Sequence, residues 1–121
     1  MAKRPSRGRF LLLVAVQLME IIFFNSRAQK FFESLDMAVR PRTSKTFGLL
    51  EYYGNKLGMP HSKALGGGLF ELRVVGTVNI RFIYAFWEDK AWVLHGFAKK
   101  TRNTPKQDID YAKTQLKLLL Q

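Results

Sequence analysis

Basic side chains interrupt or follow three strand-like apolar runs in the second half of the chain. Arg73 lies in the first run, Arg81 lies in the second, Lys99 and Lys100 follow the third, and Lys63 stands just ahead of the first. A charged side chain in the middle of a strand is costly to bury, and it usually marks a solvated face or a site for an anion. A sheet that gathers this many cations predicts a polyanionic partner and could also carry out chemistry on it.

Whether the two arginines meet depends on the hairpin that joins their strands. A two-residue turn at Gly76-Thr77 pairs Leu72 with Arg81 and sends Arg73 to the opposite face. A turn one residue longer pairs Arg73 directly with Arg81. Two like charges directly opposite each other are unfavourable unless an anion joins them. The alternative is that each arginine forms an ion pair with a neighbour such as Glu71.

The chain contains two histidines, His61 and His95, and no cysteine. Disulfides, thiolate catalysis and Cys-based metal sites are therefore excluded, and two histidines alone do not make a metal site. His61 follows Pro60 in a loop, where it could act as an acid or base or simply be exposed. His95 is expected to pack in the core. The run Gly66-Gly67-Gly68 lacks the ending of a phosphate loop and precedes a strand, so we expect a flexible lead-in to that strand.

Composition places the chain among single-domain globular proteins. It has 121 residues, of which 47% are hydrophobic, enough for one packed core. Lysine and arginine number 20 against 9 aspartates and glutamates, a formal net charge of +11. This excess favours nucleic acid, an anionic membrane surface or an acidic protein as partner. The lack of cysteine agrees with a cytoplasmic location.

Residues 1–17 form a leader that is basic at first and apolar from Phe10 to Val16. The leader resembles the front of a signal peptide, but its apolar run is shorter than the ~20 residues that span a bilayer. No small-x-small cleavage site follows it. Either the leader is an extra strand or a basic tail, or the true start is Met19 rather than Met1. The domain is assigned to residues 18–121.

The apolar patterns predict an α+β domain in the order β-α-α-β-β-β-α, with helices packed on one side of an antiparallel sheet. Asn25 or Ser26 could cap the first helix, Thr43 or Ser44 could cap the second, and Gly58 could end the second. The expected strands cover residues 18–24, 69–75, 79–87 and 92–97, and the expected helices cover residues 27–35, about 44–56 and 106–119.

Five short motifs follow one another along the second half of the chain. They are Leu57-Gly58-Met59-Pro60-His61-Ser62-Lys63, Gly68-Leu69-Phe70-Glu71-Leu72-Arg73, Arg81-Phe82-Ile83-Tyr84, Leu94-His95-Gly96-Phe97-Ala98-Lys99-Lys100-Thr101 and Thr104-Pro105. Taken together, the motifs resemble the phage-derived branch of the RelE/HigB-like toxins, which are the toxin halves of type II toxin–antitoxin modules. The resemblance covers roughly residues 19–119 and implies the compact RelE-like fold.

The resemblance also implies an endoribonuclease that enters the ribosomal A site and cuts mRNA without a metal or other cofactor. The 2′-OH of the substrate attacks the adjacent phosphate and leaves a 2′,3′-cyclic phosphate and a 5′-OH. Because the transition state carries extra negative charge, such a site is built from cations. By this resemblance Arg73 and Arg81 bind the scissile phosphate, and Lys63 assists proton transfer or binds phosphate.

The remaining basic residues are assigned to RNA binding. The resemblance places Lys99 and Lys100 on the RNA backbone or ribosomal RNA, and His61 is added to the same set. It implies a small helix-turn-helix antitoxin as partner and no membrane. The alternative function is a non-catalytic, phage-derived nucleic-acid-binding protein of the same fold. A third alternative is a membrane-surface protein that uses the leader.

Overall fold

The computed structural model describes residues 17–76 and 79–121, so only Gln17 of the predicted leader falls within the described part. The strands are β1 (Glu20–Phe23), β2 (Ser62–Gly66), β3 (Leu69–Val74), β4 (Ile80–Trp87) and β5 (Lys90–Ala98). The helices are α2 (Ser26–Glu33), α3 (Arg40–Tyr53), the 3-10 helix η1 (Gly54–Lys56) and α4 (Lys106–Leu119). The α+β class predicted from the sequence is confirmed.

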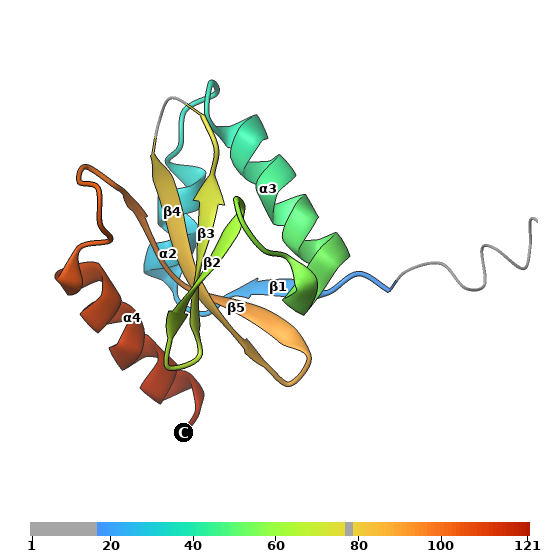
Figure 1. The fold of residues 1–121 in the computed structure, drawn as a ribbon, viewed down its shortest axis with the longest axis vertical. Helices are drawn as coiled ribbons and strands as arrows, with labels where there is room; N and C mark the ends of the chain where they lie inside the picture. Colours follow the sequence, from blue (N-terminus) through green and yellow to red (C-terminus); the bar gives the residue numbers. More distant parts are fainter. Residues whose placement is uncertain (1–16, 77–78) are drawn as a thin grey trace, which may run out of the picture.

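The strands form one sheet in the order β1-β5-β4-β3-β2 (Figure 1). β1 pairs with β5 in parallel, whereas the other neighbours are antiparallel. The prediction of a purely antiparallel sheet was therefore wrong, and β2 is an additional strand that the apolar pattern did not predict. β2 and β3 form a hairpin around Gly67 and Gly68, whose φ values of +64° and +87° favour glycine. The glycine run is thus a tight turn rather than a flexible lead-in.

Helices cover both faces of the sheet, not one face as predicted. α2 and α3 pack on the face that carries Leu72 and Phe82. α4 packs on the other face, where Ala112 and Leu119 join Ile83 in a second apolar cluster. Figure 1 shows α3 and α4 on opposite sides of the strands. Successive residues of a strand point to opposite faces of the sheet. Since helices cover both faces, the side chains of β4 are buried on both sides over most of its length.

The predicted cap of the first helix is confirmed. The side-chain oxygen of Asn25 accepts a hydrogen bond from the backbone N–H of Ala28 at 2.8 Å. The amide nitrogen of Asn25 also donates to the carbonyl of Leu94 and to the side chain of Gln115, both at 2.9 Å. Asn25 therefore connects the start of α2 to β5 and to α4. The bounds of α4 are those predicted from the sequence.

The second helix begins and ends earlier than the sequence predicted. Pro41 lies in the first turn of α3, where a missing N–H breaks no intrahelical hydrogen bond. Thr43 and Ser44, the predicted caps, consequently lie inside the helix. α3 ends at Tyr53, and its C-terminal cap is Gly54, whose φ is +57°, rather than Gly58.

Candidate phosphate-binding site

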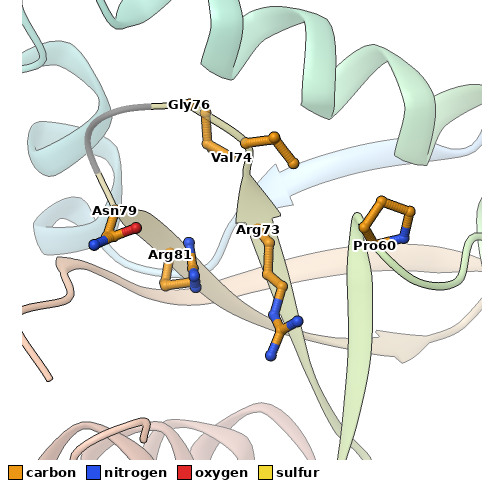
Figure 2. A pocket seen from close by; sticks show the side chains of 7 residues that line it. Pro60, Arg73, Val74, Gly76, Asn79 and Arg81 are labelled. Carbon is orange, nitrogen blue, oxygen red and sulfur yellow. The ribbon is translucent and has the colours of Figure 1, made fainter. Parts of the chain in front are cut away.

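The register of β3 and β4 places Arg73 directly opposite Arg81. Val74 pairs with Ile80 beside them, which excludes the two-residue turn and its shifted register. Alternation puts both arginines on the face that α4 covers, because Val74 and Phe82 belong to the opposite face. Figure 2 shows the two arginine side chains on neighbouring strands, with Val74 turned away from them. Of the two registers compatible with the sequence, the structure has the one that pairs the arginines.

A buried carboxylate joins the two arginines. Glu71 lies two residues before Arg73 on the same face of β3, and its side chain is 0% exposed. Its Oε1 accepts a hydrogen bond from Nε of Arg73 at 3.1 Å and lies 3.8 Å from Nε of Arg81. Its Oε2 accepts a hydrogen bond from the hydroxyl of Thr104. The shared negative charge offsets the repulsion between opposed cations, and the cations offset the cost of burying a carboxylate.

The pairing with Glu71 engages the Nε side of each guanidinium group. The Nη1 atom of Arg73 makes a long contact of 3.7 Å with the sulfur of Met59. A guanidinium group has five N–H donors, so several remain for another acceptor. The two arginines line a cavity of about 240 Å³ (Figure 2). Its other lining residues are Pro60, Val74, Val75, Gly76 and Asn79.

Two lysines border the arginine pair. Lys63 on β2 lies directly opposite Glu71 and therefore shares the arginine face. Lys99 follows β5, and its backbone N–H donates to the carbonyl of Asn79 at 2.7 Å, which brings it beside the start of β4. We call Arg73, Arg81, Lys63 and Lys99 the cation cluster. Three separate strands and the end of a fourth supply its members.

The pKa values within the cation cluster reflect this crowding. Burial lowers the pKa of Lys99, the attraction of Glu71 raises it, and the positive charges of Arg81, Arg73 and Lys63 lower it further. Burial likewise lowers the pKa of Arg81, an effect that Glu71 opposes and Arg73 reinforces. Desolvation and like charges both disfavour a cation. A negative charge beside the cluster opposes the repulsion among these cations, as Glu71 already does.

Two of the sequence-predicted residues lie outside the cation cluster. The carbonyl of His61 accepts a hydrogen bond from the N–H of Arg73 at 2.7 Å, but its side chain lines a separate cavity of about 310 Å³ near the end of α3. Lys100 lines a third cavity, between β5 and α4. His95 packs in the core as predicted, with Nε2 at 2.6 Å from Oδ1 of Asp108.

Glu71 and Thr104 are site residues that the sequence did not reveal as such. The sequence offers Glu71 only as a possible ion-pair partner, because a single acidic residue in a strand is commonplace. The period-2 alternation that places Glu71 and Arg73 on one face is the signal that could have identified it. Thr104 is 33 residues from Glu71 in the chain, and no local pattern links the two.

Comparison with known families adds a separate observation. A family model described as phage derived protein Gp49-like (DUF891) matches residues 30–117. The chain belongs to this family. In this Gp49-like protein the matched region contains the whole cation cluster together with Glu71 and Thr104. The match agrees with the phage-derived character that the motifs indicated. No curated protein matches the chain.

Two further findings concern the part of the Gp49-like protein that the structure describes. Within residues 17–76 and 79–121, no helix has both the length and the apolar character needed to cross a membrane. Over the same residues, no group of three or more His, Asp or Glu side chains is arranged to hold a metal ion.

Proposed function

We propose that this Gp49-like protein is a RelE/HigB-like toxin of a type II toxin–antitoxin module that cleaves mRNA at the ribosome. The observation that carries the proposal is the opposed pair of Arg73 and Arg81, joined by the buried Glu71 and lining a cavity. One carboxylate neutralises only one of the two positive charges, so a phosphodiester can supply a second anion to the N–H groups that Glu71 does not engage. Charge-assisted bonds from arginine to phosphate are short and strong, and they fix the orientation of the phosphate.

Transition-state charge explains why cations suffice for this chemistry. In the proposed reaction the 2′-OH of the RNA attacks the adjacent phosphorus, and the 5′-oxygen leaves. The pentacoordinate state between them carries more negative charge than the substrate, so the arginines bind it more tightly than they bind the ground state. Because Glu71 holds both guanidinium groups in place beforehand, little reorganisation is needed during the reaction.

Proton transfer is assigned to the lysines of the cation cluster. Lys99 is the candidate to accept the proton of the 2′-OH, since its pKa is lowered by burial and neighbouring cations. An ordinary lysine, with a pKa of ~10.4, is almost fully protonated at neutral pH and is a poor base. Lys63 then binds a phosphate oxygen or protonates the leaving 5′-oxygen. Lys100 and His61, which lie farther out, are assigned to the RNA backbone.

The proposed partner follows from the same charge distribution. A small helix-turn-helix antitoxin would place acidic or apolar segments over the cation cluster, or would block access to the ribosomal A site. Both effects would prevent the protein from reaching the mRNA that it cleaves. We place the protein in the cytoplasm, where ribosomes and such an antitoxin are found together.

The decisive experiment is cleavage of a defined mRNA by the purified full chain, in a translation extract and on free RNA. The expected products carry a 2′,3′-cyclic phosphate and a 5′-OH. The double variant Arg73→Ala/Arg81→Ala should lose about 100-fold or more of the rate, the scale on which single preorganised donors act. RNA binding without cleavage by the wild type would instead support the non-catalytic nucleic-acid-binding protein.

Two controls separate catalysis from folding. Lys30→Ala/Lys45→Ala removes two exposed charges from α2 and α3, on the opposite face of the sheet, and should leave the rate close to that of the wild type. Arg73→Lys/Arg81→Lys keeps the charges that neutralise Glu71 but lacks the planar fork, so it should fold and still be slow. Cleavage that survives in the Arg73→Ala/Arg81→Ala variant would contradict the proposed roles.

A further inference from the structure

A threonine just ahead of α4 contacts the buried carboxylate that joins the arginine pair. The hydroxyl of Thr104 donates a hydrogen bond to Oε2 of Glu71, which lies 33 residues earlier in the chain. A threonine near the start of a helix commonly caps that helix. The N-cap of α4 is instead Pro105, whose ring offers no hydrogen-bond acceptor. The hydroxyl of Thr104 is therefore used at the candidate site and not at the helix that follows it.

This hydrogen bond fixes the rotation of the Glu71 carboxylate. The last torsion of a glutamate side chain has a broad, roughly two-fold preference, so the side chain alone does not determine where its oxygens point. With Oε2 held by Thr104, Oε1 lies 3.1 Å from Nε of Arg73 and 3.8 Å from Nε of Arg81. Hydrogen bonds from a hydroxyl to a carboxylate are among the stronger ones in proteins. One hydroxyl thus orients the carboxylate that both guanidinium groups face.

Thr104 also anchors the loop that carries Lys99. This loop, residues 99–105, connects β5 to α4. It is attached at its start by the N–H of Lys99, which donates to the carbonyl of Asn79 at 2.7 Å. It is attached near its end by Thr104, whereas residues 101–103 between the two attachments are exposed. The two hydrogen bonds therefore hold the loop, and Lys99 with it, against the strands of the arginine pair.

The position of this loop determines the electrostatic environment of Lys99. Charged side chains from three strands act on its amine: Glu71 and Arg73 from β3, Arg81 from β4 and Lys63 from β2. Burial lowers the pKa of Lys99, Glu71 raises it, and the three cations lower it again. A loop released from Glu71 would leave Lys99 more hydrated and farther from these charges. Its pKa would then rise towards that of an ordinary lysine.

We propose that Thr104 is a positioning residue, whose hydroxyl orients Glu71 towards the arginine pair and holds the loop of Lys99 beside the cation cluster. This inference rests on the proposed endoribonuclease function. Thr104 contacts no reacting atom and acts only through Glu71 and through the loop. Valine has nearly the shape of threonine without the hydroxyl, and serine keeps the hydroxyl without the methyl group. The two substitutions therefore separate the hydrogen bond from the packing of the side chain.

The first test measures kcat and KM against pH for the full chain, with the free or ribosome-bound RNA that the wild type cuts. Thr104→Val should lower kcat about tenfold, the scale of one hydrogen bond to a charged group, and should change KM less. The rise of the rate with pH should move to higher pH, and Thr104→Ser should restore both properties. Thr101→Val is the matched control, because the hydroxyl of Thr101 bonds only within the loop, to the carbonyl of Asn103 at 2.7 Å. A wild-type rate in Thr104→Val, or a lower rate with an unmoved pH profile, would overturn the positioning role.

A second test needs no cleavage. Titration of the side-chain amine of Lys99 by NMR, on the full chain without RNA, gives its pKa directly, and the same spectra show that each variant is folded. The pKa of Lys99 should be higher in Thr104→Val than in the wild type, and Thr104→Ser should be close to the wild type. Equal pKa values in all three proteins would overturn the link between Thr104 and Lys99. A wild type that does not cut RNA would overturn the proposed function, whereas a raised pKa of Lys99 in Thr104→Val would still support the link, so the two failures are distinguishable.

Discussion

Arg73 and Arg81 face each other across two antiparallel strands, and one buried carboxylate lies against both. This relationship makes the charges of the site interdependent. The arginines tolerate their proximity because Glu71 is present, and Glu71 tolerates complete burial because the arginines and Thr104 surround it. A change at any one of these positions therefore alters the environment of the others.

Replacing Glu71 by glutamine should destabilise the fold and impair cleavage. The change leaves two opposed cations without their shared anion, and removing one partner of a buried ion pair typically costs about 3–5 kcal/mol of unfolding free energy. Denaturant unfolding measures the loss. Phosphate should restore stability to Glu71→Gln more than it stabilises the wild type, because it can occupy the vacated charge. Glu33→Gln, at an exposed position, is the matched control, and equal stability of Glu71→Gln and wild type would refute the account.

The pH dependence of cleavage should report on Lys99. Because the pKa of Lys99 is lowered by burial and by neighbouring cations, its neutral, basic form becomes available at a lower pH than for an ordinary lysine. The rate should rise with pH through that lowered pKa and level off above it. Lys99→Arg keeps the charge but stays protonated, so the rise should disappear. Lys100→Arg should retain it, and an unchanged profile in Lys99→Arg would show that another group accepts the proton.

The buried imidazole of His95 should make the fold less stable in mild acid. Burial lowers the pKa of His95, against the hydrogen bond of Asp108, and the charge of Arg27 lowers it further. The unfolded chain binds this proton near pH ~6.5, whereas the folded chain binds it only at lower pH. Between the two values the unfolded state holds more protons, so the unfolding free energy falls as the pH falls.

Denaturant unfolding at a series of pH values measures that slope. His95→Gln should flatten it within this window, because the titrating group is gone. His61→Gln removes the other histidine and should leave the slope in place. A slope that is the same in His95→Gln and in the wild type would assign the acid sensitivity to a different group.

Gly96 should not tolerate a side chain. A Cβ atom at this position would lie 2.6 Å from Cδ2 of Phe31 on α2 and 2.8 Å from Cε1 of Phe82 on β4. Overpacking of this kind costs typically 1–3 kcal/mol, so Gly96→Ala should lower the unfolding free energy by about that amount. Gly48→Ala is the counterpart: it lies in α3 with nothing within 4 Å, and it should stabilise by about 0.5–1 kcal/mol. Thermal or denaturant unfolding of both variants provides the comparison.

Local patterns predicted the elements whose own residues determine them. α4 has a continuous apolar stripe, and its bounds were predicted correctly from residues 106–119 alone. β2 was missed because its sequence, Ser-Lys-Ala-Leu-Gly, has few apolar residues. Pairing with β3 and a hydrogen bond of 2.6 Å between the hydroxyls of Ser62 and Tyr84 stabilise it instead. The parallel pairing of β1 with β5 likewise joins distant segments and has no local signature.

In the candidate site, too, the local sequence predicted some features, and others depend on segments that are distant in the chain. The sequence singled out Arg73 and Arg81 as cations within strands, but their alignment depends on the length of the connection after Val74, which two registers could satisfy. The lowered pKa of Lys99 arises from side chains on other strands and from burial, neither of which is visible in residues 99–100 themselves. The sequence thus predicted the types of residue to expect at the site. The register of the two arginines and the surroundings of Lys99 could be known only from the folded sheet.

The position of β5 between β1 and β4 has a consequence for the order in which the candidate site is assembled. Among the described strands β5 comes latest in the sequence, yet it lies between β1 and β4 in the sheet. Pairings between segments far apart in sequence are slow to form and must wait until both segments have emerged. Lys99 and Thr104 are made later still. A nascent chain therefore carries the arginine hairpin before the cation cluster is complete. With the proposed cleavage activity, we expect it to spare the ribosome that makes it until synthesis has passed Thr104.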